Sequence, residues 1–221
     1  MKNFYLLILF CCGIFSACAP TRFVKPLEEN QWAVTGSIGG PLVDFEGTTI
    51  PLPFTSMGLG YGMTDATTAF GNIHTTALAF GVLHIEAGVL QSIVEPEGIR
   101  PGLSAGGSLN FMGDMWWGNM KLFPQIDANL YWNYGYQDNF FYLGTSNWMD
   151  LSREKAHGET QQNKWIFNLQ AGHTFSGEKW DFVLEAKYLA PFHSNQNIVV
   201  DYTSFSNQGA IGAYFGIIRK F

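Results

Sequence analysis

Charged side chains are scarce in this chain of 221 residues, and positive charge is scarcer than negative. Asp, Glu, Lys and Arg make up 14% of the residues, whereas about a quarter is typical of soluble proteins. Lys and Arg number 12 against 18 acidic residues, which gives a net charge of −6. Nucleic-acid binding needs clustered Lys and Arg to displace the counterions of the phosphates, so the composition argues against a nucleic-acid partner.

Cysteine is absent from most of the chain. The three cysteines are Cys11, Cys12 and Cys18, and none follows them. A disulfide framework across a folded domain is therefore excluded, and so is a zinc site built from thiolates. His74, His157 and His173 are isolated in sequence and form no metal-ligand spacing. The sequence predicts neither a bound metal nor another cofactor.

Long hydrophobic runs are also missing, apart from one at the N-terminus. Lys2 supplies a positive start, an apolar run follows from Phe4 to Phe10, and Ser16-Ala17 are small residues. The run is too short to span a bilayer as a helix, which needs about 20 apolar residues. The pattern predicts a signal peptide over residues 1–17, a linker over 18–30 and one domain over 31–221.

The end of the predicted signal peptide carries a family motif. Phe15-Ser16-Ala17-Cys18 resembles the lipobox of bacterial lipoproteins, whose cysteine is acylated and becomes the new N-terminus. The resemblance implies a lipid on Cys18, and the alternative is an ordinary signal peptide cut near Ala19. Residues 19–22 lack the acidic stretch of surface-exported lipoproteins of the Bacteroidota. By that resemblance the lipid stays on the periplasmic leaflet and 18–30 is a periplasmic linker, with a plug formed by residues 20–30 as the alternative.

From residue 31 onward, apolar and polar residues alternate between Gly- and Asn-rich breaks. A period of two is typical of β-strands. The clearest case is 125–134, where one face carries Gln125, Asp127, Asn129 and Asn133. We expect ten strands, with eight as the alternative, at approximately 31–40, 52–62, 66–73, 76–90, 101–112, 120–134, 138–148, 163–175, 179–190 and 207–221.

The connections between these strands alternate between tight turns and longer loops. Tight turns are expected at 63–65, 135–138 and 176–179, and long loops at 149–162 and 191–206. Transmembrane barrels combine an even number of strands with short periplasmic turns and longer outer loops. We therefore predict an all-β fold, a closed antiparallel up-and-down transmembrane β-barrel with both termini in the periplasm.

The composition of the two strand faces indicates which one meets lipid. The polar face is rich in Ser, Gly, Asn, Gln and Thr rather than in charge, which suits a crowded lumen better than a water-facing exterior. Aromatic rings at strand ends are then expected to form a belt at each membrane interface. The residues of this belt are Trp32, Tyr134, Phe175 and Trp180 at the periplasmic ends, and Trp165 and Tyr188 at the outer ends.

The same alternation places several charged residues in the lumen: His84, Glu86, Asp127, Asp181, Glu185, Lys187 and Lys220. Carboxylates beside a histidine can form an acid/base site. Buried charges in a narrow barrel must also find partners, so we favour a polar network of ion pairs over a catalytic site.

Two further motifs resemble those of known outer-membrane proteins. Residues 210–221 resemble the C-terminal strand of that class, which ends in an aromatic residue read by the assembly machinery, here Phe221. Arg219 departs from this pattern, because a hydrophobic residue is usual there. Residues 60–65 look like the Tyr-Gly-X-Thr-Asp strand and turn of small barrels. Together with the lipobox, the chain resembles lipidated small outer-membrane β-barrel proteins of Gram-negative, Bacteroidota-like bacteria.

The resemblance implies outer-membrane lipid and the barrel assembly machinery as partners, but it indicates no activity. The leading hypothesis is a non-enzymatic barrel with a structural or protein-interaction role, for example as an accessory subunit of an envelope complex. The alternative is a narrow pore or ligand-holding channel, because many lumen positions are small. A lipid-tethered soluble carrier would need the strands to face the opposite way.

An enzyme that modifies lipid A is the least favoured hypothesis. His193-Ser194 resembles the His-X-Ser of lipid A deacylase barrels only in part, because the two residues are adjacent. Adjacent side chains of an extended chain project in opposite directions, so the pair could not face one substrate.

Overall fold

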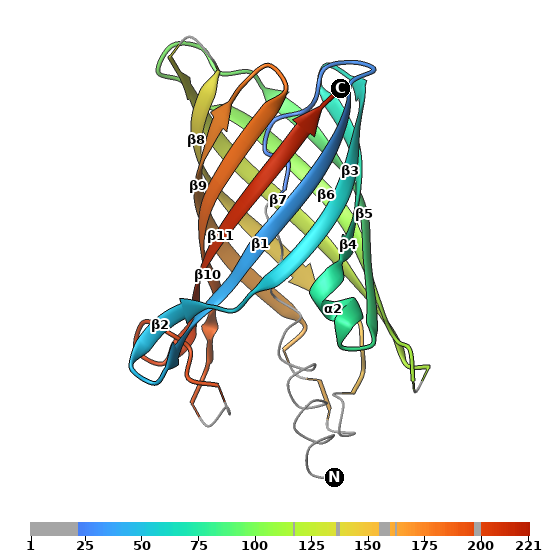
Figure 1. Cartoon of the computed structure of the whole chain (residues 1–221), viewed down its shortest axis with the longest axis vertical. Coiled ribbons are helices and arrows are strands. Elements are labelled where there is room, and N and C mark those ends of the chain that lie inside the picture. Colours follow the sequence, from blue (N-terminus) through green and yellow to red (C-terminus); the bar gives the residue numbers. More distant parts are fainter. Residues whose placement is uncertain (1–21, 117, 136–137, 155–159, 162, 197–199) are drawn as a thin grey trace.

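The computed structural model describes residues 22–116, 118–135, 138–154, 160–161, 163–196 and 200–221, and strands dominate them (Figure 1). The strands are β1 (Trp32–Phe45), β2 (Thr48–Pro51), β3 (Phe54–Thr64), β4 (Thr67–His74), β5 (Val82–Val94), β6 (Gly102–Asp114), β7 (Met120–Tyr134), β8 (Asn139–Met149), β9 (Trp165–Ser176), β10 (Trp180–Ser194) and β11 (Gln208–Lys220). A short helix, α2 (Thr75–Ala79), links β4 to β5. Among the described residues, no helix has the length and apolar character needed to cross a membrane.

The strands close into a barrel. From β3 to β11 each strand pairs antiparallel with the next one along the chain, and β1 pairs with both β3 and β11. Of the eleven strands, β2 is a side branch that pairs with the end of β1, so ten form the closed barrel. The predicted ten-stranded closed antiparallel barrel is confirmed, and the eight-stranded alternative is wrong.

The two ends of the barrel differ in their connections. One end, called the turn end, carries the start of β1, the C-terminus and the connections 65–66, 95–101, 135–138 and 177–179. The opposite end, called the loop end, carries α2, β2 and the connections 115–119, 150–164 and 195–207. In Figure 1 the turn end is at the top.

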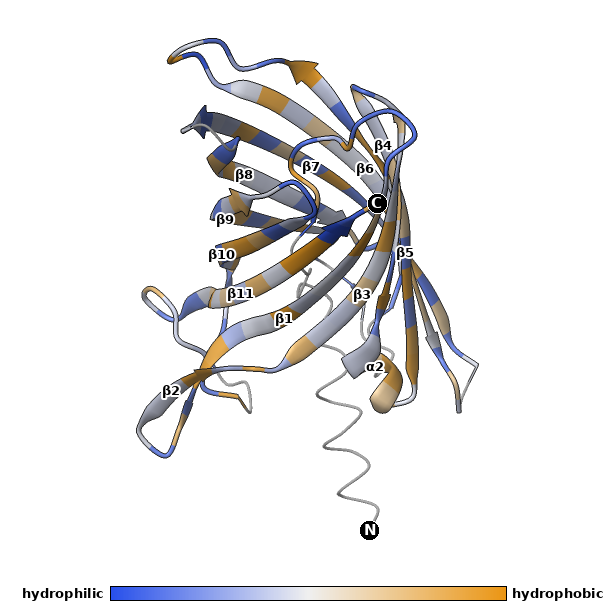
Figure 2. Ribbon diagram, turned by 45° about the horizontal axis from the view of Figure 1, so that its top comes forward, coloured by the Kyte–Doolittle hydropathy of each residue, from blue (hydrophilic) through white to orange (hydrophobic). Residues whose placement is uncertain are grey.

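Hydrophobic and hydrophilic residues alternate along the strands, as the colours of Figure 2 show, and burial alternates with them between a lumen face and an exposed exterior face. In β7, Gln125 and Asp127 are buried, whereas Leu122, Ile126 and Leu130 on the opposite face are exposed. An aqueous exterior would leave a large contiguous apolar surface in contact with water. The facing of the side chains therefore favours a barrel surrounded by lipid.

Two residues that break the alternation in sequence have specific partners. Tyr131 is fully buried in the lumen, where its ring meets the edge of Phe140 at a centroid distance of 6.0 Å. Arg219 lies over the ring of Trp180 at 4.6 Å and over that of Phe221 at 5.3 Å. Cation–π contacts thus allow a charged residue in the C-terminal strand where a hydrophobic one is usual.

The predicted strand at 76–90 is wrong at its start, because residues there form α2 and β5 begins only at Val82. The hydroxyls of Thr75 and Thr76 lie 2.7 and 2.9 Å from Thr55 Oγ1 on β3. Gly81 then turns the chain at a φ of +76°, which glycine adopts without strain. Also at the loop end, β1 extends past residue 40 to Phe45 and forms an unpredicted hairpin with β2.

Asp150 organises the start of the connection 150–164 at the loop end. Its carboxylate accepts hydrogen bonds from the Ser152 N–H at 2.9 Å and from Gln161 Nε2 at 2.5 Å. Burial by itself raises the pKa of the Asp150 carboxyl, but hydrogen bonds from Ser152 and Gln161 outweigh burial and lower this pKa.

A carboxyl with a lowered folded pKa stabilises the folded loop above its unfolded pKa, and this stabilisation is lost as the pH falls through the folded value. We expect the Ser152 amide to lose hydrogen-exchange protection below about pH 4. Asp150→Asn should show the same loss at neutral pH, whereas Asp201→Asn, in the other long connection, should not. Unchanged protection in Asp150→Asn would contradict the assignment.

Candidate functional site: a lumen closed by the N-terminal segment

The lumen at the turn end is occupied by residues 22–30, which we call the strap. The C-terminal end of the strap lies beside the rim, where the Asn30 N–H donates to the Gly62 carbonyl of β3 at 2.8 Å. Followed backward along the chain from Asn30, the strap bends over the upper rim in Figure 1 and passes into the barrel. The sequence left a periplasmic linker and a plug as alternatives, and the described part of this segment lies inside the barrel mouth.

Hydroxyl groups of the barrel wall hold the backbone of the strap. The Leu27 N–H donates to Thr68 Oγ1 of β4 at 2.7 Å, and Ser104 Oγ of β6 donates to the Val24 carbonyl at 2.6 Å. Both bonds are buried, so each satisfies a strap group that has no access to water. The small polar residues of the lumen face therefore act as backbone partners for a peptide segment.

Glycines on β3 make space for the strap. A Cβ added at Gly60 would lie 2.6 Å from the Phe23 ring and 3.1 Å from Leu27. A Cβ at Gly62 would overlap the Glu28 carbonyl. The run of small lumen residues on this strand is thus explained by close approach of another chain segment rather than by open water.

The strap also buries apolar side chains inside the barrel. Phe23, Val24 and Leu27 are at most 8% exposed. They belong to one buried cluster with wall residues, namely Ala33, Leu90, Tyr131, Phe140, Tyr142, Val183 and Ile218. An apolar core inside the lumen fixes the strap by the same burial that stabilises a globular domain.

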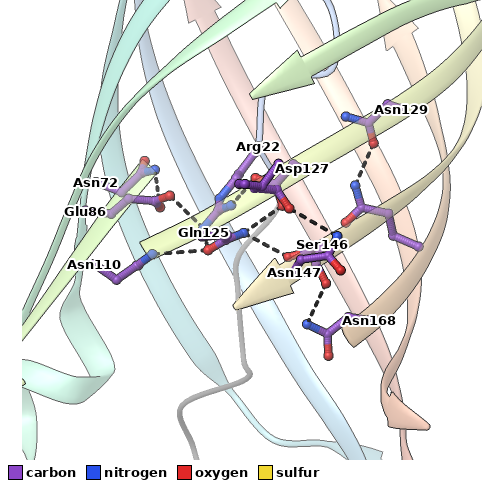
Figure 3. A network of polar contacts seen from close by, with 12 residues as sticks. Arg22, Asn72, Glu86, Asn110, Gln125, Asp127, Asn129, Ser146, Asn147 and Asn168 are labelled. Carbon is purple, nitrogen blue, oxygen red and sulfur yellow. Dashed lines mark hydrogen bonds and ion pairs between the residues drawn. The ribbon is translucent and has the colours of Figure 1, made fainter. Parts of the chain in front are cut away.

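Arg22 ends the described part of the strap and makes its strongest polar contacts. Its guanidinium donates to Asp127 Oδ2 at 2.5 Å and to Gln125 Oε1 at 2.7 Å, and it lies 2.6 Å from Glu86 Oε1 (Figure 3). The side chain of Arg22 is 11% exposed and that of Glu86 is fully buried. Two buried carboxylates therefore share one guanidinium, whose planar array of donors suits several acceptors at once.

A wider network surrounds this centre. Gln125 Nε2 donates to Asp127 Oδ1 at 2.7 Å and to Ser146 Oγ at 2.8 Å, while Asn110 Nδ2 donates to Gln125 Oε1 at 3.1 Å. Asn72 Nδ2 donates to the second oxygen of Glu86 at 3.0 Å. The carboxylates are thus bonded on both sides, as buried charges require.

Each charged residue that the sequence placed in the lumen has a partner there. His84 Nε2 is 3.0 Å from Asn110 Oδ1, and Glu185 accepts from the Tyr142 hydroxyl at 2.7 Å and pairs with Lys187 at 3.1 Å. Asp181 pairs separately with Lys220 at 2.9 Å near the turn end. The structure therefore links His84 to Asp127 through Asn110 and Gln125. It links Glu86 to Asp127 through Arg22, and it leaves Asp181 outside that group.

Sequence reasoning missed Arg22, which it placed in the linker. The available signal was the charge balance of the lumen residues. Glu86, Asp127, Asp181 and Glu185 are four carboxylates, against the two ammonium groups of Lys187 and Lys220. A further buried cation was therefore needed, and the strap supplies it.

The aromatic residues of the predicted belt lie near the two ends of the strands. Trp32, Tyr134, Phe175 and Trp180 are exposed at the turn end, and Trp165 is exposed at the loop end. Tyr188 is only partly exposed, with its ring edge-on to Phe205 at a centroid distance of 5.4 Å. Their contact with a membrane interface stays a prediction.

The strap leaves little open space around Arg22. The cavity beside it, also lined by Phe23, Asp127 and Lys187, has a volume of about 20 Å³, enough for about one water molecule. A larger cavity of about 530 Å³, which we call the vestibule, lies between the strap and β8 to β11. It is lined by Lys25, Glu28, Phe140, Asp181 and Lys220 among others.

Toward the loop end, the lumen contains a stacked histidine pair. The rings of His74 and His84 are parallel, with centroids 3.5 Å apart, and the His84 ring meets the edge of Trp148 at 6.2 Å. In the described residues, no group of three His, Cys, Asp or Glu side chains is placed to hold a metal ion.

The two ends of the chain carry the predicted lipidation and assembly signals. Cys18 lies outside the described residues. Phe221 is 69% exposed, and its N–H donates to the Trp32 carbonyl at 2.9 Å, so the C-terminal residue is tied to the first barrel strand.

No protein-family profile and no curated protein matches the chain. Among solved structures, the translocator domain of the autotransporter NalP from Neisseria meningitidis is 9% identical, covering 86% of this chain and 88% of that one, with a TM-score of 0.45. The NanC porin is 12% identical, covering 86% and 100%, with a TM-score of 0.45. OprG from Pseudomonas aeruginosa is 10% identical, covering 90% and 99%, with a TM-score of 0.34. Similarities this low say nothing of what this chain does.

Proposed function

We propose that this protein is an outer-membrane β-barrel whose turn end faces the periplasm. The apolar exterior and the difference between short and long connections support this orientation. We further propose that Cys18 carries a lipid, as its lipobox resemblance implies, and that Phe221 is read by the assembly machinery. Retention in the membrane needs no acyl group, because the barrel surface already meets lipid.

The proposed role is that of a non-enzymatic structural or protein-interaction component of the envelope, for example an accessory subunit. The observation that carries it is the closed lumen, in which the strap and its Arg22 contacts leave about 20 Å³ at the centre. A solute pathway needs continuous open volume, and a catalytic role needs a reachable group. The buried carboxylates are instead occupied by Arg22, Asn72 and Gln125.

A ligand-holding role is the second candidate, and the vestibule favours it. Its volume of about 530 Å³ falls in the range of roughly 300–1,000 Å³ that small-molecule sites occupy. The lining combines apolar residues with side chains of both signs.

The membrane and lipid parts of the proposal are tested together with Cys18→Ala. We expect mass spectrometry to find an acylated N-terminal peptide in the wild type and none in the variant. The variant should still require detergent and show heat-modifiable gel migration, because the barrel exterior is apolar. A Cys18→Ala protein that stays folded and dispersed without detergent would overturn the membrane assignment.

The interaction role is tested by native pull-down of the full chain in mild detergent. We expect a second envelope protein to be retained, and retention to survive Lys25→Gln, which alters only the vestibule. Recovery of monomer alone would count against the interaction role.

A further inference from the structure

One charged residue lies on the exterior face of the barrel strands. Along the described strand segments that pair within the barrel, Arg219 of β11 is in phase with Ile217 and with the exposed Phe215. Asp44 lies outside these segments, on the extension of β1 that pairs with β2. All other Asp, Glu, Lys and Arg residues of the segments are in phase with the lumen: Glu86, Asp114, Lys121, Asp127, Asp181, Glu185, Lys187 and Lys220. A charge on a lipid-facing surface is costly, so Arg219 requires a partner.

Two aromatic rings hold the Arg219 guanidinium but leave its N–H groups without acceptors. Its Cζ lies 4.6 Å from the centroid of the Trp180 ring and 5.3 Å from that of the Phe221 ring. A guanidinium has five N–H donors, and neither ring offers an oxygen or nitrogen acceptor, because the indole N–H only donates. Within the described part of the chain, no carboxylate, that of the C-terminal Phe221 included, forms an ion pair with Arg219.

Arg219 lies at the edge of the apolar exterior, beside the turn end. Across the strands it is paired with Val34 of β1 and Trp180 of β10. The next exterior pair toward the loop end is Phe182 with Ile217, and two strand residues cover about 7 Å. The exposed side chains of Phe182, Leu184 and Phe215 continue this face. A lipid whose headgroup lay at Arg219 would therefore have its acyl chains against apolar side chains.

We infer that Arg219 binds the phosphate of a phospholipid in the leaflet that surrounds the turn end. A phosphate supplies a negative charge and several oxygen acceptors, which match the planar array of donors of a guanidinium. Trp180 fixes the guanidinium at the membrane interface, where indole rings are favoured. The inference rests on the membrane placement proposed above. With the turn end in the periplasm, the lipid belongs to the periplasmic leaflet.

The competing explanation is that interfacial water alone solvates Arg219. A guanidinium that is solvated by water has no preference for one lipid over another. A guanidinium that binds phosphate keeps its lipid when the surrounding bilayer is removed. The two explanations therefore differ in whether a phospholipid stays on the purified barrel.

The first experiment inserts the full chain into nanodiscs that contain phosphatidylglycerol and measures retained lipid by native mass spectrometry after transfer to detergent. We expect a lipid adduct on the wild type, and a ratio of lipid-bound to lipid-free barrel that is about fivefold lower for Arg219→Gln. Arg219→Lys should fall between them, because an ammonium group keeps the charge but lacks the planar array of donors. Equal retention by Arg219→Gln and the wild type would overturn the inference.

The matched control for this experiment is Arg100→Gln. Arg100 lies in the connection 95–101, also at the turn end, so the variant makes the same change in charge away from the exterior face of the barrel. We expect Arg100→Gln to retain the adduct as the wild type does. A loss as large as that of Arg219→Gln would show that net charge, and not a site at Arg219, holds the lipid.

A second measurement uses the wild type alone and decides the question if Arg219→Gln fails to fold. The barrel in detergent is offered phosphatidylglycerol or a diacyl galactolipid, which has acyl chains but no phosphate. We expect retention of phosphatidylglycerol only, and equal retention of both lipids would overturn the inference. Excess inorganic phosphate should leave the adduct in place, and displacement would refute a lipid as the ligand. A wild-type chain that never enters nanodiscs would instead refute the membrane placement and the inference with it, so the two failures are distinguishable.

Discussion

A variant lacking residues 22–29 is expected to conduct ions in planar bilayers, where the full-length barrel gives no resolved conductance steps. The strap contributes Phe23, Val24, Leu27 and Arg22 to the filling of the lumen. The wall of the barrel is hydrogen-bonded strand to strand without help from the strap, so its removal leaves a closed barrel with a wetted interior.

The opened lumen should prefer cations. Without Arg22, the central lumen retains the carboxylates of Glu86, Asp127 and Glu185 and the ammonium group of Lys187, a net charge of −2. Rings of acidic side chains favour cation passage. A reversal potential under a KCl gradient measures this preference.

The control for the conductance experiment is Lys25→Gln. Lys25 lies at the vestibule, where its Nζ donates to Asn133 Oδ1 at 3.3 Å, and it belongs to no buried apolar cluster. This variant should therefore stay silent. A silent strap-deletion protein whose insertion is verified by heat-modifiable migration would show that the strap does not close the lumen.

Arg22→Gln is expected to destabilise the barrel by about 3–5 kcal/mol, the usual cost of removing one partner from a buried ion pair. Glu86 is fully buried and Asp127 nearly so, and both would lose the cation that pairs with them in the wild type. Unfolding by denaturant in detergent micelles, followed by tryptophan fluorescence, measures the free energy of unfolding.

Three matched variants separate charge from shape at this position. Arg22→Lys keeps the charge but loses the planar array of donors, so we expect an intermediate loss of stability. Adding Glu86→Gln and Asp127→Asn to Arg22→Gln should recover most of the loss, because no buried charge is left unpaired. In the strap deletion, leaving Glu86 and Asp127 without Arg22 should cost less free energy than in Arg22→Gln, because water then reaches both carboxylates. Equal stability of Arg22→Gln and wild type would contradict the role of this contact.

The arrangement of the strands follows from local sequence. Alternation with a period of two in β7 and β10 determines which side chains share a face, because successive residues of an extended chain point to opposite sides. The lumen positions of Glu86, Asp127 and Glu185 follow from the same rule. Strand count and the difference between the two barrel ends follow from the spacing of turn residues.

Other elements could not be predicted in this way. The sequence reading placed residues 76–79 at the start of a strand, yet hydrogen bonds to Thr55 of β3 hold Thr75–Ala79 as a helix. These bonds form only after β3 and β4 pair, so no local signal reports them. The unpredicted extension of β1 to Phe45 likewise depends on a partner, β2, outside the barrel.

The sequence by itself determined an antiparallel barrel with apolar side chains outside and small polar ones inside, and it favoured ten strands over eight. Only the tertiary structure decided what fills the interior. The strap has no hydrophobic periodicity that would predict its position. It fills the lumen only because strands that are distant in sequence close around it. Arg22 and Asp127 lie 105 positions apart in the chain and meet because ring closure brings the wall around the strap. Long-range closure, unlike strand facing, leaves no periodic pattern in the residues that depend on it.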